Sequence, residues 1–205
     1  MSKEQMIFSQ LINRGISDSL ILNAFEKVDR DDFVPFKDRR CSHSDIEISI
    51  GDNRVVVRAF ILAKIIERIL LLQPENILVL GDATGYSASV FQQIFKNVAL
   101  GTFQNSEIEN LREKVKDVKV SLVEDLKLKF DAVFLDGGFF KKETVKKIRK
   151  LINFNGCLFY FSRPPSFEFS KKQFDFFEVS VLMDRESKTE LIFKMPLYFP
   201  CETFG

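Results

Sequence analysis

The chain has 205 residues with 45% hydrophobic and 29% charged side chains, a balance typical of a folded globular protein and not of a disordered chain. Thirty basic and 29 acidic residues leave a formal charge of +1, so no global field draws the chain to nucleic acid or to an anionic membrane. Three cysteines without metal-ligand spacing and a single histidine exclude a zinc site by composition. Since the first residues also lack an apolar signal core, we expect free thiols, a cytoplasmic location and no metal, nucleic-acid or membrane partner.

Two short amphipathic helices are expected at the N-terminus, over residues 3–13 and 18–28, because their apolar side chains recur at spacings of three and four. Asp18 is a suitable N-cap for the second helix. Residues 36–56, called the arm from here on, are polar and lack helical periodicity. We expect the arm to be an irregular connection.

From residue 58 onward, apolar segments of helical and of strand character alternate. Helices are expected at 58–72, 86–96, 106–115 and 141–151, and strands at 77–81, 98–103, 118–123, 131–135 and 156–162. Such alternation gives right-handed crossovers and a mostly parallel, doubly wound α/β sheet with helices on both faces. Near the C-terminus, FFEVSVLM and ELIFKM flank the charged turn DRESKT and predict an antiparallel hairpin. We divide the chain into a helical extension with the arm, residues 1–57, and an α/β domain, residues 58–205, packed as one compact unit.

The segment ILVLGDATGYSASVF, Ile77 to Phe91, predicts a buried strand, a glycine-bounded turn and the start of a helix. In open α/β sheets this turn usually lines the ligand position, beyond the carboxyl ends of the strands where strand order reverses. Gly81 and Gly85 let the backbone come close to a ligand. The dinucleotide spacing G-x-G-x-x-G is missing, which disfavours a dehydrogenase. A tight turn that binds nothing remains the alternative.

Five segments in order resemble the protein-L-isoaspartate O-methyltransferases. They are DDFVPF, SHSDIEISIG, ILVLGDATGYSASV, VALGTF and FDAVFLDGG. The resemblance covers roughly residues 20–165. It implies the Rossmann-like class I methyltransferase fold, S-adenosylmethionine as the cofactor, and the carboxylate of damaged, isoaspartyl residues in a protein or peptide as the methyl acceptor. It does not indicate an oligomeric state.

The resemblance implies eight residues at the cofactor: Gly81, Asp82, Ala83, Gly85, Tyr86, Gln104, Asp125 and Asp136. Val79 stands where the family has an acidic residue, and Ala83 where it has a glycine. Gln104 takes the place of the carboxylate that accepts from both ribose hydroxyls, and an amide with one acceptor oxygen should cost about tenfold or more in affinity. Asp82 and Asp125 are candidate replacements, with capping or surface roles as the alternative.

The catalytic candidates that the resemblance implies are Val57, Arg58 and Asp45. Val57 stands at the position of a family serine. Its lack of a hydroxyl removes a group that would position the substrate carboxylate. It removes no obligatory proton acceptor, because an ordinary carboxylate is already ionised at neutral pH. Arg58 could hold a substrate carboxylate in a bidentate pair, although we favour a role as the first exposed residue of its helix. His43, in the arm, is expected to be a solvent-exposed loop residue.

Two principal hypotheses follow: a methyltransferase of the isoaspartyl type, or a family member that has kept the fold, lost cofactor binding or catalysis, and acts as a binding or scaffold protein. A methyltransferase with another substrate is the third. The glycines of the turn favour the first, and Val57, Val79 and Gln104 favour the second. On the first hypothesis, we expect Gly85→Val to abolish cofactor binding with the fold mostly intact.

Overall fold

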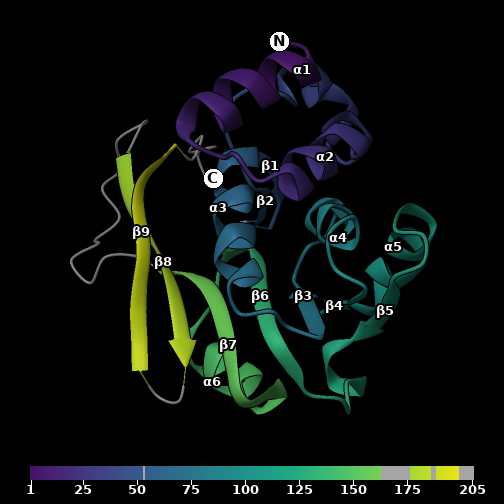
Figure 1. Cartoon of the computed structure of the whole chain (residues 1–205). Helices are drawn as coiled ribbons and strands as arrows, with labels where there is room; N and C mark the ends of the chain where they lie inside the picture. Colours follow the sequence, from purple (N-terminus) through teal and green to yellow (C-terminus); the bar gives the residue numbers. More distant parts are fainter. Residues whose placement is uncertain (53, 163–175, 186–187, 199–205) are drawn as a thin grey trace.

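A seven-stranded sheet forms the centre of the computed structural model, which describes residues 1–52, 54–162, 176–185 and 188–198 (Figure 1). The strand order is β5-β4-β3-β6-β7-β8-β9. The bounds are β3 (Asn76–Leu80), β4 (Asn97–Thr102), β5 (Lys119–Leu122), β6 (Phe130–Phe139), β7 (Ile152–Ser162), β8 (Phe176–Arg185) and β9 (Lys188–Tyr198). The first five strands in this order are parallel, while β8 and β9 join as an antiparallel hairpin. The expected sheet and C-terminal hairpin are confirmed.

Helices cover both faces of the sheet, as a doubly wound fold requires. They are α3 (Ala59–Leu70), α4 (Tyr86–Gln92), α5 (Ile108–Lys114) and α6 (Lys142–Ile148). Alternate side chains of β3 point to opposite faces: Ile77 and Val79 lie in the larger apolar cluster with α3, α4 and α5, whereas Leu78 and Leu80 lie in the smaller one with α6. β4 and β6 flank β3, so the strand order reverses at β3.

The N-terminal segment is helical where expected, although its first helix is irregular. α1 (Lys3–Met6) continues through a π-helical turn, η1 (Ile7–Leu11), and a 3-10 turn, η2 (Ile12–Arg14). α2 (Ser19–Lys27) begins at Asp18, whose carboxylate accepts from the N–H groups of Leu20 and Ile21, so the predicted N-cap is confirmed. Met6 and Phe25 share the larger apolar cluster with α3. In Figure 1 these helices lie at the top of the view, next to α3 and α4.

The expectation of an irregular arm is wrong. Its first part is a 3-10 helix, η4 (Phe36–Cys41), and its last part is a two-stranded antiparallel hairpin, β1 (Ile48–Gly51) with β2 (Arg54–Val56). Gly51 and Asp52 adopt positive φ values of 88° and 52°, which makes the reversal possible. The remaining short 3-10 turns are η3 (Arg30–Asp32), η5 (Asn105–Glu107), η6 (Val123–Asp125) and η7 (Arg149–Leu151). Among the helices of the described ranges, none has both the length and the apolar character needed to cross a bilayer.

Gly85 is fixed by the packing of the fold. It is the N-cap of α4 with φ +84°, and a Cβ atom there would lie 2.3 Å from Cγ2 of the buried Val115. A β-branched core side chain cannot rotate freely out of the way. The expectation that Gly85→Val leaves the fold mostly intact is therefore wrong, since any larger residue strains both the backbone and the contact with α5.

Gly85→Ala should lower the free energy of unfolding by about 2–4 kcal/mol, from the positive φ together with overpacking. Gly15→Ala is the matched control, because Gly15 has φ +88° and a methyl group there would have none of the described residues within 4 Å; it should lose only about 1 kcal/mol. Urea unfolding of both variants measures the difference. Equal losses would show that contact with Val115 contributes nothing.

Candidate functional site

The glycine-bounded turn lies where the sequence predicts it. Gly81 follows β3 with φ +90°, and its N–H donates to the carbonyl of Gly101 in β4 at 3.0 Å. A Cβ atom at Gly137, just beyond Asp136 in β6, would lie 2.8 Å from the carbonyl oxygen of Gly81. The turn therefore sits between the carboxyl ends of β4 and β6, at the strand-order reversal.

Asp82 caps the helix that follows the turn. Its buried carboxylate accepts hydrogen bonds from the main-chain N–H groups of Thr84 (3.1 Å), Gly85 (2.8 Å) and Ala88 (3.0 Å). These are donors that a helix start leaves without an intrahelical partner. The structure thus supports the capping alternative for Asp82, and the donors that a ligand could have used are already engaged.

Asp136 ends the straight part of β6, and its carboxylate is buried beside that of Asp82. The positive φ values of Gly137 and Gly138 let the chain bulge after it, where the β6–β7 register shifts. Burial, together with the nearby charge of Asp82, raises the pKa of Asp136 to about 8. Burial also raises the pKa of Asp82, but its donors favour the ionised form. Near neutral pH, Asp136 therefore carries a proton.

Tyr86 connects the turn to the N-terminal segment. Its ring is buried, with the ring of Phe33 at 5.7 Å between centroids and the guanidinium carbon of Arg30 5.7 Å from its centroid. Burial raises the pKa of its hydroxyl, so Tyr86 stays neutral and its role is to fill space under the arm.

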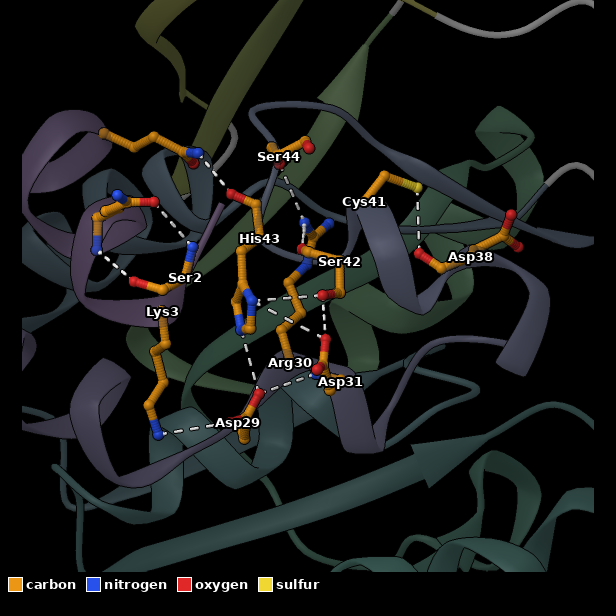
Figure 2. A network of polar contacts seen from close by, with 12 residues as sticks. Ser2, Lys3, Asp29, Arg30, Asp31, Asp38, Cys41, Ser42, His43 and Ser44 are labelled. Carbon is orange, nitrogen blue, oxygen red and sulfur yellow. Dashed lines mark hydrogen bonds and ion pairs between the residues drawn. The ribbon is translucent and has the colours of Figure 1, made fainter.

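Arg30 anchors the arm through hydrogen bonds from its guanidinium to main-chain carbonyls (Figure 2). The side chain is only 1% exposed, and its guanidinium donates to main-chain carbonyls in the middle of the arm and at its C-terminal end. The acceptors are Ser42 (2.6 Å), Ser44 (3.4 Å), Ile46 (3.1 Å), Val56 (2.9 Å) and Val57 (2.8 Å). All five bonds come from Nη1 and Nη2, whose N–H groups fan out in the plane of the guanidinium. The sequence interpretation missed Arg30, because its partners are backbone atoms that carry no sequence pattern.

His43 is buried, so the expectation of an exposed loop histidine is wrong. Figure 2 shows its ring between Asp29 and Asp31, with Nε2 3.1 Å from Oδ1 of Asp29. Ligand atoms of these three residues lie within 4.8 Å of one another, yet Asp29 also pairs with Lys3 at 3.6 Å and Asp31 accepts from Ser42. The cluster is an ion-pair network that ties the arm to the N-terminal helices.

The three catalytic candidates have structural partners. Val57 is buried, and its main-chain carbonyl accepts a hydrogen bond from the guanidinium of Arg30. Arg58 is 4% exposed and its Nε donates to Oε1 of the equally buried Glu47 at 2.6 Å, so the expectation of an exposed helix start is wrong. Burial raises the pKa of Glu47, while Arg58 opposes that shift. Asp45 forms an ion pair with Arg14 at 2.8 Å.

Phe103, and not Gln104, is the residue after β4 that faces the turn. A Cβ atom at Gly81 would lie 3.7 Å from Cε2 of Phe103 and 3.0 Å from Cζ of Phe140. Gln104 is exposed at the start of η5, and Asp125 is exposed at the end of η6. The structure brings together Gly81, Asp82, Ala83, Gly85, Tyr86 and Asp136, but leaves Gln104 and Asp125 at the rim.

Glu107 is a further acidic group near the end of β4 that the sequence interpretation missed. It accepts from the hydroxyl of Thr102 and pairs with Arg54 of β2. This ion pair links the arm to the segment after β4. The only signal in the sequence was an acidic residue at the start of a helix, which a capping role explains equally well.

The strand-order reversal at β3, the turn at that point and the antiparallel C-terminal strands agree with the class I methyltransferase fold. Two solved structures share it at 14% identity, which shows the fold alone. A protein-L-isoaspartate O-methyltransferase matches with TM-score 0.64 over 97% of this chain and 63% of its own. A Plasmodium falciparum structure named for the same enzyme, in complex with S-adenosyl-L-homocysteine, matches with TM-score 0.65 over 98% and 96%.

The family model for protein-L-isoaspartate(D-aspartate) O-methyltransferase matches residues 1–137, which is more than half of the chain. The chain belongs to this family. Curated relatives are the protein-L-isoaspartate O-methyltransferases 1 of Rhodopseudomonas palustris (34% identical over 45% of this chain) and of Syntrophobacter fumaroxidans (28% over 67%), and number 2 of Marinobacter nauticus (32% over 56%). The matches span 38%, 69% and 50% of these relatives' own lengths, so the similarity establishes the family and not the activity of a whole relative.

The backbone of the turn fits S-adenosylmethionine, but two aromatic rings and a carboxylate lie against it. The rings of Phe103 and Phe140 lie against Gly81, and the carboxylate of Asp82 occupies main-chain donors of the turn. The backbone of the turn keeps the two positive-φ glycines that the family resemblance implies. The obstacle is therefore in the side chains and not in the path of the main chain.

Arg30→Lys should lower the free energy of unfolding by about 2–4 kcal/mol, because an ammonium with three donors leaves buried carbonyls without partners. Arg39→Lys, at an exposed arginine, is the control and should stay within about 0.5 kcal/mol of wild type. Urea unfolding gives both values, and limited proteolysis reports whether the arm has loosened. A loss in Arg30→Lys no larger than in the control would contradict the anchoring role.

Asp136→Asn should stabilise the protein increasingly as pH rises from about 4 to about 8. The native pKa is raised above the unfolded value of 3.8, so native wild type keeps a proton that the unfolded chain releases in this window. The contribution of protonated Asp136 to the free energy of unfolding is fully present below pH 4. It falls by at most about 1.4 kcal/mol per pH unit up to about pH 8. Denaturant unfolding across this range, with exposed Asp125→Asn as the control, measures the effect. A pH-independent difference between Asp136→Asn and wild type would contradict it.

Proposed function

We propose that the chain is an S-adenosylmethionine-dependent methyltransferase of the protein-L-isoaspartate type, which forms a methyl ester on the carboxylate of isoaspartyl residues in proteins or peptides. The family match over residues 1–137, which includes the turn and the arm, carries the proposal. A cytoplasmic location is part of it, supported by the free thiols of Cys41 and Cys157.

Methyl transfer to the proposed acceptor, a carboxylate, needs no general base. A carboxylate with an ordinary pKa of about 4 is ionised at neutral pH, so the protein has to orient its oxygen and exclude water. The arm, fixed by Arg30, supplies a rigid surface for that task. Arg58 is committed to Glu47, so it shapes the arm and does not itself bind the substrate carboxylate.

A binding or scaffold function is the second candidate. The specific observation that favours it is the contact of the Phe103 and Phe140 rings with Gly81. Val57 and Val79 add to it, since both are apolar where the family resemblance implies polar groups. On this alternative the arm presents a surface to a protein partner without methyl transfer.

The test incubates the purified chain with labelled S-adenosylmethionine and a peptide that contains one isoaspartyl residue, with the aspartyl peptide of the same sequence as the control. The proposed function requires methyl ester on the isoaspartyl peptide alone. Binding of S-adenosylhomocysteine in calorimetry without transfer to either peptide would move the proposal to another substrate. Absence of both binding and transfer would favour the scaffold function.

A further inference from the structure

Two phenylalanine rings lie against Gly81, the first residue of the turn. Phe103 comes directly after β4, and Phe140 comes directly after β6. Their ring centroids are 5.5 Å apart with the planes tilted by 37°. Because a methyl group at Gly81 would lie 3.0 Å from one ring and 3.7 Å from the other, the pair is in contact range of the turn's backbone.

The two rings differ in how they are held. Phe140 packs against the smaller apolar cluster, which contains Leu80 and Leu135. Phe103 is 40% exposed. Phe103 can therefore rotate into solvent without disturbing the core, whereas rotation of Phe140 away from Gly81 gives up part of its packing against that cluster.

The main chain next to Phe103 is held by side-chain contacts. Glu107 pairs with Arg54 of the arm and accepts from Thr102, which immediately precedes Phe103. The arm is in turn held by Arg30. Access to Gly81 consequently depends on the rotamers of the two rings and not on opening of the arm.

We propose that Phe103 and Phe140 set the cofactor affinity of this chain: S-adenosylmethionine and its product bind at Gly81 only in conformers where the rings have turned away. The proposal rests on the proposed function. Packing of the aromatic pair favours the closed arrangement. The apparent dissociation constant equals the intrinsic one divided by the open fraction, so removing either ring should tighten binding.

The test is calorimetric titration with S-adenosylhomocysteine of wild type, Phe103→Ala and Phe140→Ala. Both variants should bind about tenfold more tightly than wild type, or better. Phe154→Ala is the matched control, since Phe154 in β7 is 88% exposed, and it should bind as wild type does. Circular dichroism checks the folding of Phe140→Ala, whereas Phe103→Ala removes a half-exposed ring and keeps the test valid if Phe140→Ala fails to fold.

A further variant, Phe103→Glu, distinguishes obstruction of Gly81 by the ring from hydrogen bonding to the cofactor's ribose. It removes the ring and places a carboxylate, which can accept from both ribose hydroxyls, after β4. It should bind more tightly than Phe103→Ala. Tighter binding in Gln104→Glu without any gain in the Phe103 variants would overturn the proposal, because the residue facing the cofactor would then be Gln104.

The remaining outcomes distinguish the proposal from the proposed function. Tight binding by wild type with no gain in Phe103→Ala and Phe140→Ala overturns the proposal and leaves the function standing. Weaker binding in these variants also overturns it, since the rings would then form part of the binding surface. Binding only in the variants supports the proposal and removes the methyltransferase function from the natural chain. Binding by none of the proteins overturns both.

Discussion

The buried guanidinium of Arg30 fixes the arm relative to the sheet, and the geometry of the site depends on it. It reaches carbonyls from Ser42 to Val57, so the middle of the arm and its C-terminal end converge on one charged group. Hydrogen bonds from a charged donor are each worth about 1.5–3 kcal/mol, and a carbonyl left buried without a partner costs about 1–3 kcal/mol. The carbon atom of the same guanidinium lies 5.7 Å from the ring centroid of Tyr86, the first residue of α4. One side chain thus sets the distance between the arm and the turn.

Charged groups around the turn and the arm are paired or hydrogen-bonded within the chain, although the buried hydroxyl of Tyr86 has no hydrogen-bond partner among the described residues. Asp82 caps α4, Arg58 pairs with Glu47, and Glu107 pairs with Arg54. A buried charge is tolerated only when it is paired or hydrogen-bonded, and the proton on Asp136 avoids a second charge beside Asp82. Membership of a methyltransferase family and a turn covered by aromatic rings are compatible if the rings, and not the backbone, control access to Gly81.

The sequence predicted the sheet, its covering helices and the C-terminal hairpin, because the apolar periodicities of 2 and 3.6 record which faces are buried. The sequence did not predict the burial of polar side chains whose partners lie far away in the chain. Arg58 and His43 are buried because Glu47 forms an ion pair with the first and Asp29, distant in the sequence, hydrogen-bonds to the second. At the end of β4, a shift of one residue exchanges the side chain that faces the turn, so Phe103 stands where Gln104 was expected. The hairpin of the arm was too short for its alternation to be recognised.

A crystal structure of the chain with S-adenosylhomocysteine tests this account most directly. We predict that the ligand lies against Gly81 with the rings of Phe103 and Phe140 rotated away, while the guanidinium of Arg30 keeps its contacts with the carbonyls of the arm. A ligand bound at Gly81 with both rings in their present positions, or with the arm detached from Arg30, would contradict it.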